Sequence, residues 1–379
     1  MSIRVNPGFI KELTKYGARE WNACFHCGNC TAVCSLTERG ILFPRKEIRA
    51  IQMGLTEKLA SSPEPWLCYY CGDCSENCPR DANPGEIMMS LRRYLTSIYD
   101  WTGMAARLYK SYAAHLWFMI FLFLAVIAAF VIFSRIPDSP EVQLNTFAPV
   151  HIISLLDHIL LIFLGSFLIT NIINMYVKII IKDKTVKIPV WLYFKEAWNA
   201  IFQFATQWNI TKCQRNNWYW FGHWFLFTGY ILMFIMVIFF LDWFQTEEIH
   251  PFYHPQRILG YYVTAGFLFG TIYFMIGRYR KKKEIFKYSH HSDWIFVVLL
   301  FLLAFTGIFI HIFRVNGMAL PTYYAYVLHL AVEVPMVVTF VAFSKWSHLA
   351  YRPLAIYFAH LKKSARALQE NKKLELVAQ

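Results

Sequence analysis

Two runs of four cysteines constrain this chain more than any other feature of its sequence. Each run has the spacing C-x2-C-x2-C-x3-C, in which three thiolates surround one corner of an iron-sulfur cube and the fourth ligates a neighbouring cube. The spacing predicts two [4Fe-4S] clusters with crossed ligation. The expected ligands are Cys24, Cys27, Cys30 and Cys78 for cluster 1, and Cys68, Cys71, Cys74 and Cys34 for cluster 2.

Disulfides and zinc are the alternatives for such a segment. No apolar targeting segment is found before Cys24, so we expect a reducing compartment, in which disulfides are rare. Zinc ribbons use paired C-x2-C units without a third and fourth cysteine at this spacing. Cys213 stands alone, and we interpret it as a non-ligand whose role the sequence leaves open.

The residues around the cysteines predict helices. Apolar residues recur at helical spacing from Pro44 to Leu59, between the two runs. Asn83 and Pro84, after the second run, suit the N-cap and first position of a further helix. We therefore predict an α-helical ferredoxin domain over residues 1–110.

The chain as a whole has a membrane protein's composition, and we predict an all-α fold. Of 379 residues 57% are hydrophobic and 16% are charged, against roughly 25% charged in soluble domains. Six apolar runs are long enough to cross about 30 Å of hydrocarbon. The predicted spans are 112–133, 150–181, 218–241, 258–277, 294–313 and 323–343, within a transmembrane domain over 111–361 that precedes a tail over 362–379.

The net charge of +13 belongs to the membrane topology and predicts no nucleic-acid partner. Lys and Arg gather in the loops on the side of the cysteine domain, whereas the opposite loops hold only Arg135, Arg257 and Arg314. Positive loops stay inside, so we expect a multi-pass inner-membrane protein with both termini and the cluster domain cytoplasmic. Residues 189–217 are amphipathic, aromatic and basic, which predicts an interfacial helix and the nearest landing surface for the cluster domain.

Histidines within apolar spans are costly and often mark functional sites, although neighbouring helices can satisfy them. His223 and His348 lie at the same depth on different predicted spans, which suits the two axial positions of a haem iron. Gly222 and Gly229 are predicted to leave room for the macrocycle.

A second haem is predicted near the outer face, which would make residues 111–361 a dihaem domain of cytochrome b type. His329 lies about 28 Å along a continuous helix from His348, and Pro335 between them is expected to correct the difference in their directions. We favour His158 as its partner, with His151 and His311 as alternates. Other histidines are interpreted as interfacial or loop residues: His115, His250, His254, His290, His291 and His360.

Two acidic residues in apolar spans are candidates for taking protons from a quinol, namely Glu333 and Asp157. A carboxylate that orients a haem-ligating histidine is an equal alternative. The catalytic residues therefore remain unknown at this point.

The cysteine runs and the histidine motifs described above resemble those of known protein families. The cysteine runs followed by Asn83-Pro-Gly-Glu-Ile-Met-Met resemble the C subunit of heterodisulfide reductase. The spans with Gly222-His223, His329 and Trp346-Ser347-His348 resemble that enzyme's E subunit and the gamma subunit of respiratory nitrate reductase. The fusion resembles the C subunit of the quinone-interacting membrane-bound oxidoreductase complex of sulfate reducers. Where the gamma-subunit pattern has a second histidine, this chain has Met233, a further candidate ligand for the outer haem.

The resemblance implies an electron-transfer subunit of a multi-subunit oxidoreductase. Menaquinol is the implied donor, with two b haems, two [4Fe-4S] clusters and flavin-containing cytoplasmic subunits on the route to adenylylsulfate reductase in sulfate respiration. Two alternatives stay open: the same path reversed as a quinone reductase, and a non-redox membrane anchor with a docking ferredoxin domain. The sequence leaves direction, quinone type and partner stoichiometry undecided.

Overall fold

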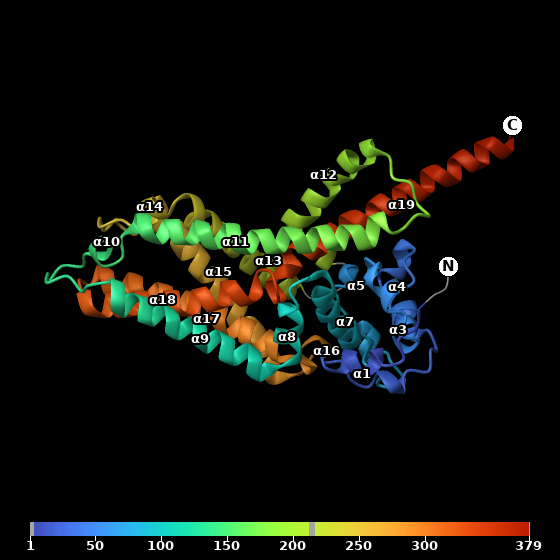
Figure 1. The fold of residues 1–379 in the computed structure, drawn as a ribbon, viewed down its shortest axis with the longest axis horizontal. Coiled ribbons are helices and arrows are strands. Elements are labelled where there is room, and N and C mark those ends of the chain that lie inside the picture. The colour runs from blue at the N-terminus through green and yellow to red at the C-terminus, as the bar shows by residue number, and fades with distance from the viewer. Residues whose placement is uncertain (1–3, 212–216, 379) are drawn as a thin grey trace.

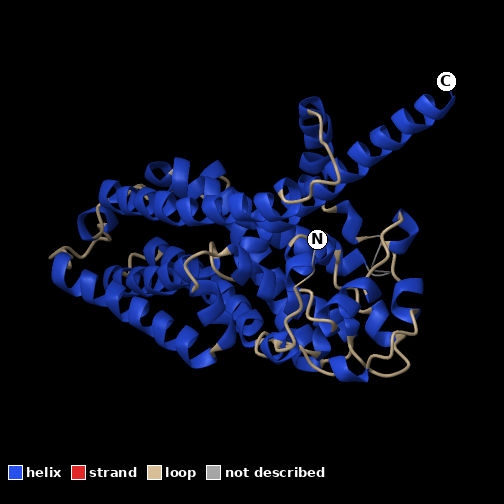
Figure 2. Ribbon diagram, turned by 45° about the vertical axis from the view of Figure 1, so that its right-hand side comes forward, coloured by secondary structure: helices blue, strands red, loops and turns tan. Residues whose placement is uncertain are grey.

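The computed structural model describes residues 4–211 and 217–378, with a small N-terminal domain at one end of a bundle of long helices (Figure 1). Figure 2 shows helices joined by loops, and no strand occurs in those described ranges. The predicted all-α class is therefore confirmed. Cys213 lies outside the described residues.

Short helices form the N-terminal domain. They are α1 (Phe9–Thr14), η1 (Trp21–Ala23), α2 (Asn29–Ala32), η2 (Thr37–Arg39), α3 (Arg45–Gln52), α4 (Thr56–Ala60), α5 (Glu64–Leu67), α6 (Asp73–Glu76), α7 (Pro84–Tyr99) and α8 (Met104–Lys110). The helix predicted from Pro44 to Leu59 is divided at Gly54, which has a φ of +65° and contacts the backbone of Asn6. A Cβ there would lie 2.1 Å from the Asn6 oxygen, so this close approach ends α3.

Six helices of the described residues are long and apolar enough to span a membrane, as predicted. They are α9 (Tyr112–Phe133), α11 (Val150–Tyr176) with its π-helical continuation η3 (Val177–Ile181), α13 (Asn217–Phe239), α15 (Pro255–Arg280), α17 (His291–Val315) and α18 (Ala319–Phe340). The connections contain α10 (Leu144–Phe147), α12 (Val190–Thr206), η4 (Trp208–Ile210), α14 (Leu241–Phe244) and α16 (Glu284–Lys287).

The last apolar helix ends earlier than expected. α18 ends at Phe340, a turn leads into η5 (Lys345–Ser347), and α19 (His348–Ala378) then carries the chain to its C-terminal end (Figure 1). The prediction of one continuous helix bearing both His329 and His348 was therefore wrong. Pro335 lies within α18, before the break. The predicted tail is the second half of α19, so no structural boundary falls at residue 361.

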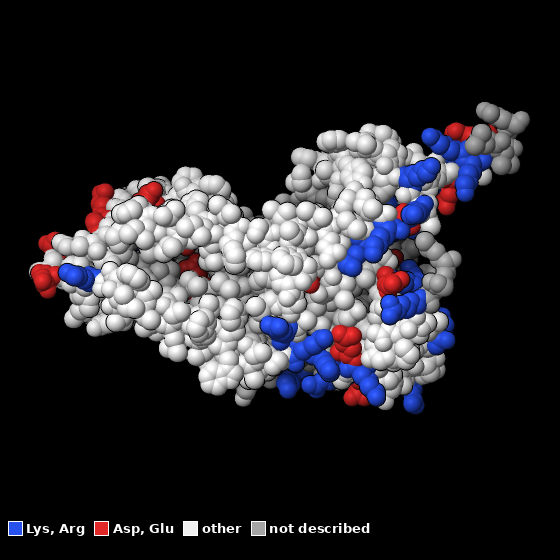
Figure 3. Space-filling view, viewed as in Figure 1, with Lys and Arg blue, Asp and Glu red and all other residues white. Residues whose placement is uncertain are grey.

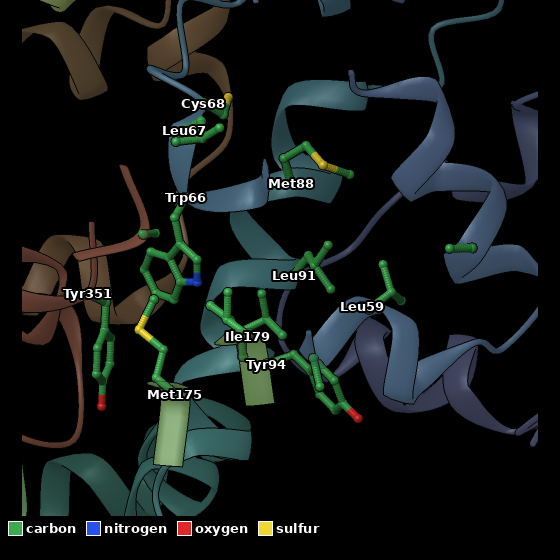
Figure 4. Close-up of a cluster of buried hydrophobic side chains, with 14 of the residues drawn as sticks. Leu59, Trp66, Leu67, Cys68, Met88, Leu91, Tyr94, Met175, Ile179 and Tyr351 are labelled. Atoms are coloured by element: carbon green, nitrogen blue, oxygen red, sulfur yellow. The ribbon is translucent and has the colours of Figure 1, made fainter. Parts of the chain in front are cut away.

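One hydrophobic core joins the N-terminal domain to the bundle. The ring of Tyr351 in α19 packs 5.4 Å from Trp66 in α5 and 5.5 Å from Tyr99 in α7. Met175 and Ile179, from α11 and η3, belong to the same cluster (Figure 4). Burial of this shared apolar surface fixes the orientation of the domain relative to the membrane helices.

The amphipathic segment after η3 forms α12, which packs against α19. Its outward side chains are large and aromatic: Trp191, Phe194, Trp198 and Phe202 are exposed. Such a face suits the interfacial position that the sequence predicts. The N-terminal domain, however, packs on the bundle through α19, α11 and α16, so α12 is not its main seat.

Charge is distributed unevenly along the molecule. Figure 3 shows Lys and Arg gathered over the N-terminal domain and α19, an almost uncharged surface over the long helices, and a mostly acidic opposite end. We call the end beside the N-terminal domain the inner end of the bundle and the opposite one the outer end.

Candidate functional site: two cysteine clusters and a histidine-lined cavity

The first predicted cluster set is assembled in the structure. Cys24, Cys27, Cys30 and Cys78 all line one small cavity, although Cys78 comes from the second run. Burial raises the pKa of the Cys30 thiol, and the other three thiols are near enough to raise it further. The backbone N–H of Ala82 donates to Cys78 Sγ at 3.4 Å. Four thiols around one cavity are the donor set that a [4Fe-4S] cube requires.

The second run receives its fourth member from the first. Burial raises the pKa of the Cys74 thiol well above its usual value, and the thiols of Cys68, Cys34 and Cys30 add to this effect. Cys34 thus lies beside the second run, as crossed ligation predicts. Cys30 is near both sets, so the two predicted cluster positions are neighbours.

The arrangement of thiols bears on the zinc alternative. No group of three or more His, Cys, Asp or Glu side chains within the described ranges is arranged to hold a single metal ion. A cube separates its thiolates more widely than one ion does, because irons and sulfides fill the centre. The four thiols that line the first cavity are the number of ligands that a cube takes.

His223 and His348 meet at the inner end of the bundle. His223 comes from α13 and His348 from the first position of α19, and both line one cavity of about 230 Å³. Burial lowers the pKa of His348 to about 3, and the nearby His223 ring contributes to the lowering. Nδ1 of His223 is hydrogen-bonded to Gln207 Oε1 at 2.7 Å, and Nδ1 of His348 donates to the Lys345 carbonyl. In both rings Nε2 is the nitrogen left for a metal.

The N-terminal domain forms part of the cavity wall. Tyr69 and Tyr70, which lie between Cys68 and Cys71, line the same space as His223 and His348. Arg92 of α7 holds this loop in place because its guanidinium donates to the carbonyls of Pro65, at 2.7 Å, and Cys68. The second cysteine run therefore borders the two histidines directly.

A buried ionic network crosses the junction between the domain and the bundle. Arg93 of α7 pairs with Glu86 at 2.9 Å and with Asp293 of α17 at 3.1 Å, and Asp293 also pairs with Lys345. The Tyr70 hydroxyl donates to Glu86 at 3.1 Å. Buried charges are tolerated when they are paired in this way. The network connects the second cysteine run with the residues that precede His348.

The outer histidines are placed differently. His329 Nδ1 is hydrogen-bonded to Thr306 Oγ1 of α17 at 2.8 Å, and His158 Nδ1 donates to the Ser154 carbonyl of its own helix at 2.7 Å. His151 is exposed on α11, and Met233 packs against the apolar core of the bundle. Both ring nitrogens of His311 have partners, Arg257 at 2.7 Å and Tyr261 at 2.9 Å. These contacts select no pair among the outer candidates.

The two acidic candidates lie near each other. Asp157 of α11 and Glu333 of α18 are close enough to interact electrostatically, and the Tyr326 hydroxyl is near both. Sequence reasoning missed Tyr326, which in turn donates to Gln245 Oε1 at 2.9 Å. Two carboxyl groups beside a phenol form a polar cluster within the apolar bundle.

Two interpretations of single residues need correction. Gly222 and Gly229 face α15, where an added Cβ would meet Phe269 at 3.6 Å and Phe267 at 3.5 Å, so they serve helix packing and not a cavity. His115, expected to be interfacial or in a loop, is fully buried, and neither of its ring nitrogens has a hydrogen-bond partner in the described structure.

Comparison with known proteins identifies the N-terminal region. Residues 20–82 match the family described as 4Fe-4S dicluster domain. A protein of Archaeoglobus profundus, named as like the C subunit of heterodisulfide reductase, is 38% identical over 91 residues, which are 24% of this chain and 47% of that protein. An iron-sulfur C subunit of the CoB-CoM heterodisulfide reductase of Methanocaldococcus jannaschii is 34% identical over 96 residues, 23% of this chain and 51% of that protein.

The matches cover the cysteine region and leave the membrane helices without a named relative. The chain spans about half the length of these curated relatives, and no solved structure matches it. The chain thus combines an N-terminal region similar to a 4Fe-4S dicluster domain and to heterodisulfide reductase C subunits with six helices, in the described residues, that can span a membrane.

Proposed function

We propose that this chain is the membrane electron-transfer subunit of a quinone-linked oxidoreductase. Electrons from menaquinol pass to the two cysteine-held clusters and from there to soluble flavoprotein subunits, with adenylylsulfate reductase as the eventual acceptor that the family resemblance implies. The positive inner end and the mostly acidic outer end support a cytoplasmic cluster domain and cytoplasmic termini.

The observation that carries this proposal is the cavity shared by His223, His348 and Tyr69. Two imidazoles from different helices, each with Nδ1 engaged, would hold a b haem through their Nε2 atoms. In that position a b haem would supply one-electron chemistry, which the transfer of a quinol's electron pair to single-electron clusters requires. Tyr69 and Tyr70, within the second cysteine run, form the wall of the cavity that faces the cysteines.

Other residues of the helix bundle would exclude water from the route of the electrons or accept protons from the quinol. Aromatic walls around His223, including Phe274 at a ring-centroid distance of 6.5 Å, keep the cavity apolar between its polar groups. Asp157 and Glu333, which interact electrostatically, are the groups that would accept protons from a quinol in this proposal. A second b haem near His329, with His158 as the favoured partner, stays a prediction.

The proposal is tested on the intact complex by stopped-flow spectroscopy with a menaquinol analogue. The haem, followed through its b-type absorbance, should be reduced before the clusters. His223→Ala should block quinol-driven cluster reduction and leave reduction by dithionite intact. His360→Ala, which changes an exposed histidine of α19 that is not a candidate haem ligand, serves as the control. Cluster reduction by quinol at the normal rate in His223→Ala, or a chain that binds no haem, contradicts the proposal.

A further inference from the structure

Positive side chains outnumber carboxylates on the wall of the histidine cavity. Its charged lining consists of Arg92, Arg93, Arg278, Lys345 and Arg352 against Glu86 and Asp293. Both carboxylates are already paired, Glu86 with Arg93 and Asp293 with Arg93 and Lys345. The wall therefore has positive charge that the described protein groups do not neutralise.

Two of these guanidinium groups also have unused donors. Arg278 Nε and Arg352 Nη2 are buried atoms without a hydrogen-bond partner in the described part of the chain. Arg278 Nη1 donates to Ser289 Oγ at 2.8 Å, and Arg352 lies 3.9 Å from the ring centroid of Tyr69. Buried N–H groups of native proteins are nearly always satisfied, so both positions call for an acceptor. A guanidinium is suited above all to a carboxylate or phosphate.

The two arginines are placed beside the histidine pair. Arg352 follows His348 by four residues on α19 and so lies one turn along the same face. Arg278 follows Phe274 by four residues on α15, and the Phe274 ring packs edge-on against His223. Each arginine is thus one turn from another residue that lines the cavity, and the two come from different helices.

We propose that Arg278 and Arg352 bind the two carboxylates of the group held between His223 and His348. This inference rests on the proposed function, because a b haem carries two propionates. A quinol is neutral and would leave both guanidinium groups uncompensated. The side chains thus define which edge of the ligand faces the cluster domain.

Arg352 has a second role in this arrangement. Its guanidinium stacks on Tyr69, one residue after Cys68, so the side chain that receives a carboxylate also contacts the second cysteine run. The carboxylate edge of the ligand is therefore directed toward the second cluster set. Arg352 is a positioning residue at the contact between the two modules.

The experiment compares Arg278→Gln, Arg352→Gln and Arg352→Lys in the purified holoprotein. Haem content and midpoint potential are measured by redox titration at fixed pH. Removal of one positive charge destabilises the reduced form, so each Gln variant should shift the oxidised-to-reduced ratio about tenfold, or about 59 mV for a one-electron couple. Arg352→Lys keeps the charge and should retain most of the potential. Arg280→Gln, at an exposed arginine of the same helix as Arg278, should change nothing.

The outcomes separate this inference from the proposed function. If His223→Ala and His348→Ala both lose the haem but the Gln variants keep wild-type content and potential, the carboxylate assignment is overturned and the haem site stands. If the wild-type chain holds no haem, both fail. Cluster signals in electron paramagnetic resonance report folding, and a Gln variant that loses haem with intact clusters supports the assignment.

Discussion

The histidines at the inner and outer ends of the membrane bundle differ in their surroundings. At the inner end His223 and His348 come from separate helices, use Nδ1 for protein partners and face one cavity. At the outer end His329 and His158 also use Nδ1, for Thr306 and Ser154, but lie on helices whose contacts pair neither with another candidate, and His311 uses both ring nitrogens. Equal depth in the membrane is therefore insufficient to define a haem site, and convergence on a common space is the more informative observation.

The largest effect should come from the inner pair. His223→Ala or His348→Ala each removes one axial donor, so both variants should lose the same b-type absorbance almost completely. His329→Ala should leave that absorbance unchanged. Reduced-minus-oxidised spectra of the purified variants measure this difference. If His223→Ala and His348→Ala lose different signals, the inner histidines do not form a pair and the comparison fails.

The cysteine sets offer a second large effect. Cys34→Ser should perturb the cluster built mainly on Cys68, Cys71 and Cys74, because Cys34 lies beside Cys74. Cys78→Ser should perturb the other cluster, since Cys78 lines the cavity of the first run. Electron paramagnetic resonance distinguishes the two signals. Each serine affecting the cluster of its own run would show that ligation is not crossed.

The ionic network at the inner end should contribute to stability. Asp293→Asn leaves Arg93 and Lys345 without their shared partner, and loss of one member of a buried pair costs about 3–5 kcal/mol. Thermal unfolding in detergent and release of the N-terminal domain by limited proteolysis measure the loss. Glu12→Gln is the matched control because the Lys110–Glu12 pair is half exposed at 3.0 Å, and such pairs contribute about 0–1 kcal/mol. Equal effects of the two substitutions would contradict a structural role for the network.

Much of the fold follows from two sequence signals. Hydropathy predicts the six long helices because a bilayer demands long apolar runs. The observed helix ends differ from the predicted ones by a few residues where a polar turn, such as His291 to Asp293, continues the helix beyond the apolar run. The cysteine spacing predicts the two ligand sets because the chemistry of the cube fixes it. Both signals are local in sequence.

What the sequence does not reveal depends on contacts between distant segments. The break after Phe340 precedes the segment in which Lys345 pairs with Asp293 of α17, and the division at Gly54 depends on Asn6. Arg352 and Tyr69 are far apart in sequence, so their contact has no local pattern. His115 resembles a polar residue at a helix end, yet the packing of α9 against α18 buries it. Tertiary packing decides each of these features.

The smallest expected effect concerns His311, and it tests the comparison from the opposite side. His311→Ala removes the hydrogen bonds to Arg257 and Tyr261, each of which contributes about 0.5–1.5 kcal/mol to stability. The variant should keep every b-type signal, because both ring nitrogens of His311 are engaged by protein partners and neither is free for iron. Reduced-minus-oxidised spectra of His311→Ala and His158→Ala make the comparison. In the unchanged chain the bond of His158 to Ser154 uses Nδ1 and leaves Nε2 for iron. Loss of a haem signal in His311→Ala would mean that its contacts rearrange on cofactor binding. The outer end would then build its site by exchanging protein partners for iron, whereas the inner end has its donors already in position.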